Sequence, residues 1–402
     1  MSPPSRNPLS DPRQALARAR ALLPRHLDLL ARLVELDSTA AGAGGHACVA
    51  LCDAALTELG FAAGAPGAPG DRHLVRERAP TAAGGAPRAT LLVVGHLDTV
   101  LPGGPGTLHR DGARWRGPGV IDMKGGVVTA LLSLALAREA GALDTVRVRV
   151  ALNGDEETGS ATGGPIVRAA ARGADVALCF EAARDGGGVV VARKGLGTAR
   201  IEVRGRTGHA GIDHDRAANA FSALCRLIAR AEDLERTLAV SVSPGGAVAV
   251  SPRALNAIPA HATCELEWRF FDAAAGGELL PALRAAGAEI AAATGAEIAI
   301  EGAIEVPPMQ PSAATHALLA RYQAAAAALG LTIDGAATAG VGDMNEIAAL
   351  GPACLDGVGP EGGAMHSTDE WLAVDTIAER AAMNALAIAA WSSELAATGA
   401  AP

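Results

Sequence analysis

The sequence predicts an α/β protein whose larger domain has a mixed, mostly parallel sheet and carries an inserted α+β sandwich. Between residues 89 and 180, apolar runs alternate with helical segments, which is typical of a layered domain with a mostly parallel sheet. After residue 194 the order becomes strand, helix, strand, strand, helix and strand, which indicates a small sandwich. The 402 residues also exceed what one hydrophobic core usually holds.

The first part of the chain begins with two predicted helices. Residues 14–36 have the apolar spacing of an amphipathic helix, and residues 45–60 form a second helix. The Gly/Pro/Ala stretch from 62 to 87 is predicted as loop or edge hairpin, with a strand at HLVRER. Three strands then alternate with helices that begin after Gly126 and Gly164. These strands are residues 89–96, 146–153 and 175–180.

The inserted segment is predicted to span residues 194–309. It divides the larger domain into residues 1–193 and 310–402. Its strands and helices are predicted at residues 197–205, 217–234, 245–251, 262–271 and 276–294.

The return to the larger domain is predicted from composition and periodicity. Residues 301–312, EGAIEVPPMQPS, are rich in proline and are expected to form the linker. Helices near 312–329 and 372–396 then complete the larger domain.

Composition excludes several classes of partner. The net charge of −9 gives no general attraction to nucleic acid or to anionic membranes, so we expect neither as a partner. The N-terminal MSPPSRNPLSDPRQ lacks the apolar segment of a secretory signal, and no run approaches 18 apolar residues. We therefore expect a cytoplasmic protein.

The six cysteines indicate buried thiols rather than a disulfide framework or a structural zinc site, because no C-x-x-C pair occurs. They are Cys48, Cys52, Cys179, Cys225, Cys264 and Cys354. His46 with Cys48 and Cys52 is a local cluster that could suggest a metal site. Cysteines four residues apart on an apolar helix are usually packing residues, which we take as the better interpretation.

Acidic and imidazole side chains follow several of the predicted strands, where open α/β sheets bind their ligands. Five carboxylates gathered at that edge would repel one another unless cations neutralised them, so the pattern predicts a metal site. The candidate residues are His96, Asp98, Asp122, Glu156, Glu157, Glu181 and His366.

These motifs, in this order, resemble the M20 family of zinc-dependent peptidases and amidohydrolases, and most closely its glutamate carboxypeptidase-like branch. The motifs are GHLDTV, DMKGG, DEETGS, GRTGHAG and HSTDE, and the resemblance runs from about residue 25 to the C-terminus. It implies a metal-dependent hydrolase that cleaves an amide bond next to an amino acid with a free carboxylate, in a small peptide or an N-acyl amino acid. A glutamate carboxypeptidase-like exopeptidase is the first function that it indicates. The resemblance also implies that the insert is a lid and dimerisation domain, and hence a homodimer.

The resemblance further implies two Zn²⁺ ions per subunit, with Co²⁺ or Mn²⁺ as alternatives. His96 and Glu181 would hold one ion and Glu157 and His366 the other, while Asp122 would bridge them. A cis peptide bond after Asp122 is also implied.

Three residues are expected to act in catalysis. Asp98 lies two residues after His96 and can accept its second imidazole N–H, while Glu156 is suited to act as general base. The alternative interpretations are a turn residue and a solvated acid. By resemblance, His209 would donate to the scissile carbonyl oxygen, commonly from the other subunit; taken alone it would be a loop residue.

Asn256 and Arg269 match a family pair that binds the substrate's carboxylate, although Arg269 alone would more often be a surface charge. The sequence departs from the carboxypeptidase branch after Glu181, where Ala182 replaces a common proline. No basic residue there is a clean match for reading an acidic side chain, and the candidates are Arg184, Arg193 and Lys194.

Two other functions stay open. The same motifs occur in N-acyl amino acid deacylases, namely acetylornithine deacetylases, succinyl-diaminopimelate desuccinylases and aminoacylases. A non-catalytic binding protein on the same scaffold would be expected to lack Glu156 or a ligand, and none is missing. A P-loop enzyme is disfavoured because no G-x-x-x-x-G-K-[ST] motif occurs.

Overall fold

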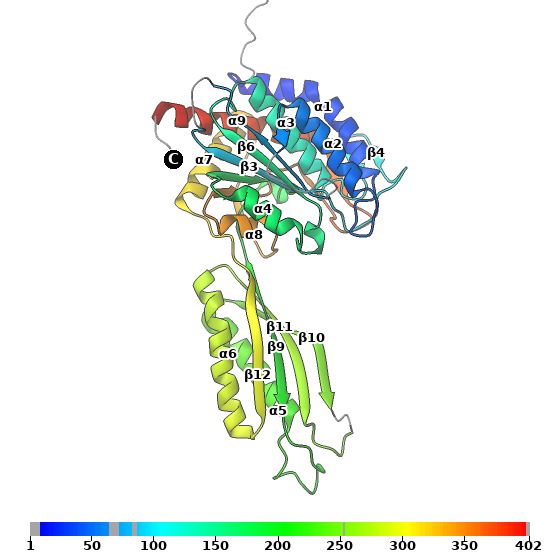
Figure 1. Cartoon of the computed structure of the whole chain (residues 1–402), viewed down its shortest axis with the longest axis vertical. Coiled ribbons are helices and arrows are strands. Elements are labelled where there is room, and N and C mark those ends of the chain that lie inside the picture. The colour runs from blue at the N-terminus through cyan, green and yellow to red at the C-terminus, as the bar shows by residue number, and fades with distance from the viewer. Residues whose placement is uncertain (1–8, 64–71, 83–86, 252–253, 399–402) are drawn as a thin grey trace, which may run out of the picture. The chain divides into compact units, whose positions relative to one another are not determined.

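The chain folds into two compact units, which we describe separately (Figure 1). The computed structural model describes residues 9–63, 72–82, 87–251 and 254–398. The first unit comprises Met1–Val191, Pro311–Ala337 and Gly342–Pro402. The second unit comprises Ala192–Gln310 and Thr338–Val341.

The first unit is built on a six-stranded sheet with the order β1-β2-β6-β3-β7-β14. β6, β3, β7 and β14 run parallel, while β1 and β2 are antiparallel additions at one edge. The prediction of a mixed, mostly parallel sheet is therefore confirmed. The strands are β1 Ala62–Ala63, β2 Leu74–Arg78, β3 Thr90–His96, β6 Arg147–Asn153, β7 Val176–Cys179 and β14 Ala353–Leu355.

Helices cover both faces of this sheet, with α1, α3 and α9 on one side and α4 on the other (Figure 1). Every residue of β3 is buried, as expected for a strand covered on both faces. The helices of this unit are α1 Pro12–Val34, α2 Gly45–Glu58, α3 Lys124–Glu139, α4 Gly163–Ala171, α7 Ala313–Ala328, α8 Asp343–Ala348 and α9 Val374–Thr398.

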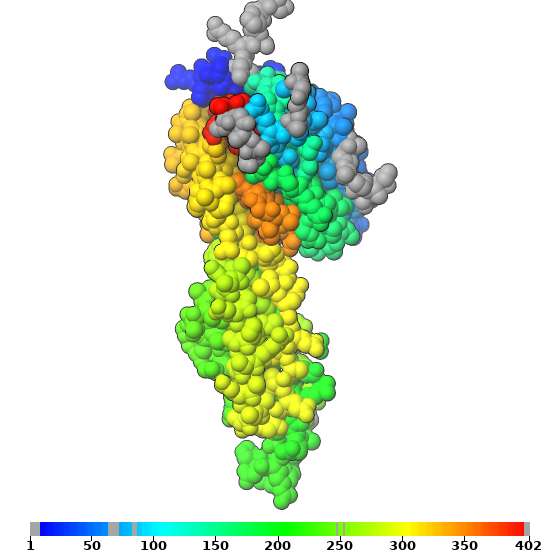
Figure 2. All heavy atoms as spheres, turned by 60° about the vertical axis from the view of Figure 1, so that its left-hand side comes forward, coloured from blue at the N-terminus to red at the C-terminus, as the bar shows by residue number. Residues whose placement is uncertain are grey.

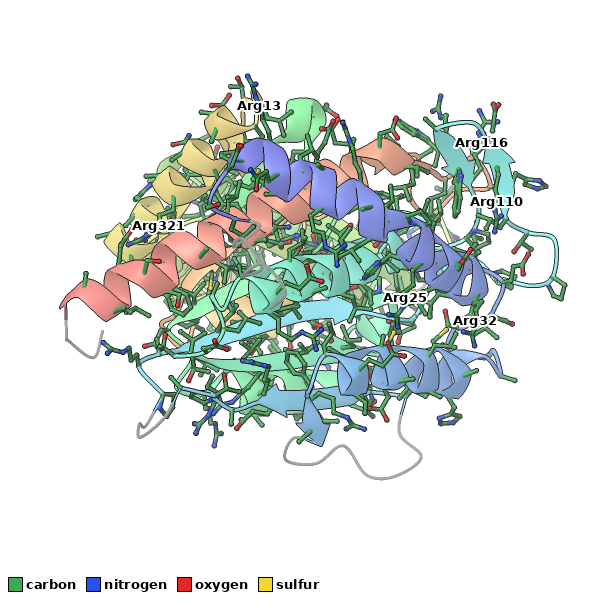
Figure 3. The ribbon with its side chains drawn as sticks, turned by 90° about the horizontal axis from the view of Figure 1, so that it is seen from above. Arg13, Arg25, Arg32, Arg110, Arg116 and Arg321 are labelled. Carbon is green, nitrogen blue, oxygen red and sulfur yellow. The ribbon has the colours of Figure 1, made fainter. Side chains whose placement is uncertain are left out.

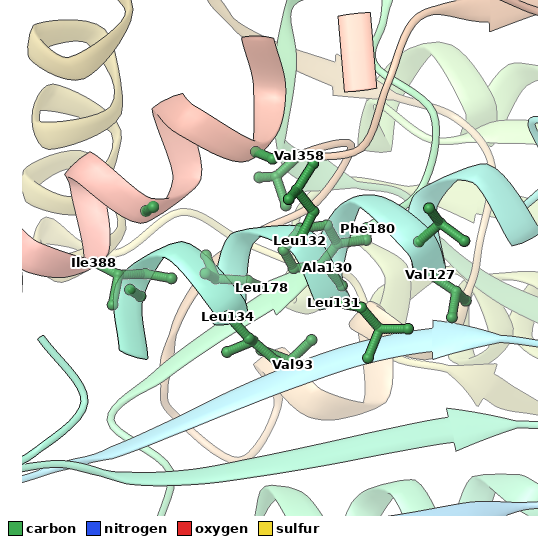
Figure 4. Packing of buried hydrophobic residues seen from close by; sticks show 14 of the residues in the cluster. Val93, Val127, Ala130, Leu131, Leu132, Leu134, Leu178, Phe180, Val358 and Ile388 are labelled. Atoms are coloured by element: carbon green, nitrogen blue, oxygen red, sulfur yellow. The ribbon is translucent and has the colours of Figure 1, made fainter. Parts of the chain in front are cut away.

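Figure 4 shows how α3 packs in this core. Leu131 and Leu134 of α3 point toward the strands, where Val93 of β3 meets them, and Ile388 of α9 lies near the same helix. Almost every residue of α3 is buried, so this helix fixes the position of the loop that precedes it.

Smaller elements complete the first unit. β4 His109–Asp111, β5 Arg114–Arg116, β15 Gly362–Gly363 and β16 Trp371–Ala373 form a second sheet, and the Arg114 guanidinium lies 3.8 Å from the centre of the Trp371 ring. α8 lies beside α4 at the surface (Figure 2). β8 Val189–Arg193 pairs with β13 Gly335–Thr338.

The second unit is a four-stranded antiparallel sheet with the order β10-β11-β9-β12, covered by α5 and α6. Asn219 and Asp272 cap the two helices by accepting hydrogen bonds from backbone N–H groups of their first turns. The elements are β9 Gly195–Arg204, α5 Ala220–Leu238, β10 Ser241–Ser251, β11 His261–Phe270, α6 Ala273–Thr294 and β12 Glu297–Val306.

The predicted return linker is partly wrong. Residues 301–306 belong to β12, which pairs with β9 along its length, and the Pro-rich segment begins only at Pro307. Residues 301–305 of this edge strand are all exposed, so this half of the strand has no buried apolar face to mark it in the sequence. Residues 338–341, which the sequence analysis placed in the larger domain, group with the second unit.

The predicted strand at HLVRER is confirmed as β2. Much of the surrounding Gly/Pro/Ala stretch, at 64–71 and 83–86, lies outside the described residues, as does the start of the N-terminal segment. Among the described helices, none combines the length and apolar composition that crossing a bilayer requires.

Arginines project from the outside of the first unit, as Figure 3 shows for Arg25 and Arg32 of α1 and for Arg321 of α7. Several pair with acidic side chains on neighbouring helices. Arg321 Nε donates to Glu394 Oε1 of α9 at 3.0 Å, and Arg25 pairs with Glu58 of α2. Such exposed pairs contribute little to stability, about 0–1 kcal/mol each.

Candidate metal centre

The acidic and imidazole candidates of the first unit lie at the carboxyl ends of its parallel strands. His96 ends β3, and Glu181 comes two residues after β7. Glu156 and Glu157 form the 3₁₀ turn Glu156–Thr158 that follows β6. Asp122 lies two residues before Lys124, where α3 begins.

A close backbone approach holds the Asp122 loop beside Glu181. A Cβ atom on Gly126, in the first turn of α3, would lie 1.8 Å from the carbonyl oxygen of Phe180. No larger residue fits there, so the second glycine of the DMKGG motif lets α3 begin against the end of β7.

Two groups of three side chains each could hold a metal ion, and they share Asp122. In the first group, His96 Nε2 lies 3.1 Å from Asp122 Oδ1 and 3.5 Å from Glu181 Oε1. In the second group, His366 Nε2 lies 3.1 Å from both Asp122 Oδ2 and Glu157 Oε2. Each Asp122 oxygen therefore faces a different group.

These separations fit a zinc-type site. Donor atoms around a four-coordinate zinc with bonds of about 2.0–2.1 Å lie about 3.3 Å apart, close to the distances found in both groups. Imidazole and carboxylate are also ligand types that zinc accepts. With three protein donors each, both groups leave a position for water or substrate.

Asp98 has a wider role than the sequence suggested. His96 Nδ1 lies 3.0 Å from the backbone carbonyl oxygen of Asp98 and 3.5 Å from its carboxylate Oδ1. The two carboxylate oxygens accept the backbone N–H groups of Glu156 at 3.1 Å and Glu157 at 2.9 Å. Asp98 thus orients His96 largely through its backbone, and its carboxylate fixes the turn that carries both glutamates.

Electrostatics in the metal-free chain show how strongly the centre attracts positive charge. Burial raises the pKa of Glu156 to about 8, and the charges of Glu181 and Asp343 add to the effect. Burial likewise raises the pKa of Glu157 to about 7, with Asp122 contributing. Without a cation, these carboxyl groups take up protons instead.

His96 responds in the opposite direction. Burial alone would lower its pKa, but hydrogen bonding to the carboxylates of Asp122, Asp98 and Glu181 outweighs burial and raises the pKa well above 6.5. In the metal-free chain, the positive charge of a protonated His96 offsets the negative charge of these carboxylates, as a bound metal cation would.

These shifts predict an unusual pH dependence for the metal-free protein. The folded state keeps protons on Glu156 and Glu157 that the unfolded chain releases above about pH 4.5. Because the folded state then binds more protons, the free energy of unfolding should fall as pH rises from about 5 to 8. We expect the Tm measured in chelator to decrease across this window.

The matched control is Glu156→Gln. Its metal-free Tm should fall less steeply as pH rises, because the variant lacks one of the two carboxyl groups whose pKa is raised. A Tm that stays constant or increases between pH 5 and 8 in the chelated wild type would contradict the assignment.

The backbone is unusual at two of the ligand residues, Asp122 and His366. The peptide bond between Asp122 and Met123 is cis, as the resemblance implied. His366 itself has a left-handed backbone with φ of 62°. Residues other than glycine seldom adopt this conformation, and it is found more often at functional sites.

The second unit contains the expected catalytic residue His209 and the expected substrate-binding residues Asn256 and Arg269. His209 and Asn256 are neighbours, since the Ala210 N–H donates to the Asn256 carbonyl at 2.9 Å and residue 209 bridges to residue 257. Both side chains are exposed. Arg269 lies near the other end of β11, where its Nε donates to Glu267 Oε1 at 2.6 Å.

The cysteine cluster is a packing feature. Cys48 and Cys52 are fully buried in the core of the first unit, whereas His46 is exposed. Among the described residues, the only metal-type groups are the two that share Asp122.

Sequence reasoning assigned no role to several residues that support the centre. Asp343 accepts hydrogen bonds from Ser160 Oγ at 2.6 Å and from Asn153 Nδ2 at 2.8 Å, which ties α8 to the Glu156 turn. Glu370 accepts three backbone N–H groups of the Asp122 loop. For Glu370, its place at the end of the HSTDE motif was the available signal.

Comparison with known proteins gives the family. Residues 92–390 match the model of peptidase family M20/M25/M40. A succinyl-diaminopimelate desuccinylase of Cereibacter sphaeroides is 32% identical over 317 residues, which cover 70% of this chain and 78% of that protein. Carboxypeptidase G2 of Pseudomonas sp. is 30% identical over 193 residues, 46% of each chain.

The fold agrees with this result. The crystal structure of aminopeptidase PepT from Bacillus cereus superimposes with a TM-score of 0.77 at 19% identity, covering 92% of this chain and 99% of that one. The chain therefore belongs to peptidase family M20/M25/M40 and is a metal-dependent hydrolase.

Proposed function

We propose that this protein binds two divalent ions, zinc in the first instance, and hydrolyses an amide bond next to an amino acid with a free carboxylate. The observation that carries the proposal is that the two oxygens of Asp122 face two separate ligand groups, completed by His96 and Glu181 and by Glu157 and His366. A shared carboxylate of this kind suits a pair of ions about 3.5–4 Å apart.

Bound ions would supply Lewis acidity toward the scissile carbonyl and the attacking water. Glu156 is the proposed general base. Its carboxylate accepts a proton as the water oxygen bonds to the carbonyl carbon, and returns that proton to the nitrogen as the C–N bond breaks. Bound cations would lower the raised pKa that Glu156 has in the metal-free chain, because opposite charge favours the ionised form, and so would leave its carboxylate able to accept the proton.

We place His209, Asn256 and Arg269 around the substrate: His209 would donate to the carbonyl oxygen, and the other two would bind the carboxylate. Along β11, Arg269 is separated from His261 by about 26 Å, at about 3.3 Å per residue. His209 and Asn256 lie beyond the His261 end, so one chain cannot bring all three to one small substrate. A homodimer that supplies them from two copies accounts for this separation.

For the substrate, an N-acyl amino acid is better supported than a peptide with C-terminal glutamate. The match to the desuccinylase spans 78% of that protein, whereas the match to carboxypeptidase G2 spans 46%. We therefore place a deacylase of the desuccinylase type first, reversing the preference of the sequence analysis, and a glutamate carboxypeptidase second.

Arg184 is the basic residue that we favour for binding an acidic acyl group. It lies three residues after Glu181, and its Nε is a buried atom without a hydrogen-bond partner. Of the other candidates, Arg193 donates to the Gly340 carbonyl at 3.1 Å and Lys194 donates to Ser241. A guanidinium suits a carboxylate geometrically.

The test is hydrolysis by the zinc-loaded protein of a panel of N-succinyl amino acids, N-acetyl amino acids, dipeptides with C-terminal glutamate, and folyl-type glutamates. We expect the highest kcat/KM on an N-succinyl substrate. Highest activity on C-terminal glutamate would favour the carboxypeptidase instead. The Glu156→Gln variant serves as the blank, because it should show no comparable turnover on any compound.

A further inference from the structure

Glu370 makes a set of contacts that points beyond ordinary packing. Its side chain is buried, with 4% of the residue exposed. Oε1 accepts the backbone N–H groups of Ile121 at 2.9 Å and Asp122 at 3.0 Å, and Oε2 accepts that of Gly119 at 2.9 Å. The backbone carbonyl of Glu370 also accepts the Gly117 N–H at 3.3 Å. A single residue thus holds the Asp122 loop at four points.

These contacts add to the packing of α3 in holding the loop that leads into Asp122. Gly117 and Gly119 both have positive φ angles, and the loop leads directly into the shared ligand Asp122. Hydrogen bonds to an ionised acceptor are about twice as strong as those between neutral groups. The Glu370 carboxylate therefore helps to fix the position of the Asp122 backbone, together with the packing of α3.

The same residue is tied to the second histidine. Glu370 lies four residues after His366, and a compact turn joins them. The Ser367 hydroxyl donates to the Ala364 carbonyl at 2.7 Å, and the Glu370 N–H donates to the Ser367 carbonyl at 3.2 Å. The turn connects His366 to a carboxylate that is anchored on the Asp122 loop.

We propose that Glu370 is a positioning residue that sets the separation of Asp122 and His366, and so controls binding of the second metal ion. The ligand atoms concerned are Asp122 Oδ2 and His366 Nε2, 3.1 Å apart. The first group depends on it less, because His96 and Glu181 are carried by β3 and the end of β7. The inference rests on the proposed two-ion centre.

Glu370→Gln is the most selective test. The amide oxygen of the glutamine can still accept from Ile121 and Asp122. Its NH₂ group would face the Gly119 N–H, so that hydrogen bond is lost and two donors are left facing each other. We expect the dissociation constant of the second ion to rise by about 10- to 100-fold, as for other residues that orient ligands. The first ion should bind nearly as in the wild type.

Binding would be measured by titrating chelator-treated protein with zinc against a competing indicator, beside the Tm of the metal-free protein. Asp369→Asn is the matched control. It removes the same charge from an exposed neighbouring side chain, which makes no hydrogen bond to the Asp122 loop among the described residues. It should bind both ions normally. Glu370→Asp, which keeps the charge, should restore part of the affinity for the second ion.

Two outcomes would overturn the inference in distinguishable ways. If the wild type binds two ions and Glu370→Gln binds both with wild-type affinity while its metal-free Tm falls, Glu370 only stabilises the fold. If the wild type itself binds fewer than two ions, the two-ion centre fails, and the role of Glu370 fails with it.

Discussion

Glu156→Gln should retain both metal ions and lower kcat by about a hundredfold or more. The substitution keeps the size of the side chain but removes the group that accepts and returns the proton, a contribution usually worth about 10²–10⁴. Metal binding should persist, because Glu156 belongs to neither ligand group. The backbone N–H of residue 156, which donates to Asp98, is also unaffected. Steady-state kinetics and elemental analysis of the same sample would check this.

Glu394→Gln is a suitable control, since Glu394 pairs with Arg321 on the outside of the first unit. Its kinetics should match the wild type. Near-normal turnover by Glu156→Gln with both ions bound would show that the division of labour between Glu156 and Glu157 is wrong.

Asp122→Asn should have the greatest effect on metal content. One carboxylate oxygen faces each ligand group, and the amide keeps only one oxygen and has less negative charge. Changes to residues that merely orient ligands cost about 10–100-fold in metal affinity, so loss of a shared ligand should exceed this. We expect less than one ion per chain after dialysis, and turnover close to background.

Asp111→Asn, an exposed aspartate on β4, is the matched control and should keep full metal content. Retention of two tightly bound ions by Asp122→Asn would exclude the shared-ligand arrangement.

The main sheet could be predicted because its strands have strong patterns. β3 and β7 are mainly apolar, β6 alternates arginine with valine before Ala151 and Leu152, and the residues of all three strands are largely buried. β14 could not be found this way, since it has three residues and follows Gly351 and Pro352. Its place next to β7 is a long-range pairing that local sequence does not encode.

The site shows the same contrast. The side chains that gather at the metal centre stand in motifs whose order could be recognised in the sequence. The contacts that hold them depend on the backbone. The Glu370 carboxylate accepts backbone N–H groups of the Asp122 loop, and the Asp98 carboxylate accepts those of the turn after β6. Only the folded chain brings these residues together. Backbone donors carry no residue-type signal, so such supports stay hidden until the structure is known.

The position of the second unit within the sequence of the first has a consequence for protein synthesis. Chains emerge from the ribosome N-terminus first, and domains generally fold as units when they are complete. The first ligand group is fully encoded by residue 181, before Ala192–Gln310 begins, whereas the second needs His366. Any product whose translation stops inside the second unit therefore carries the ligands of one ion only. It also lacks β14 and α9, and so exposes part of the core that they cover.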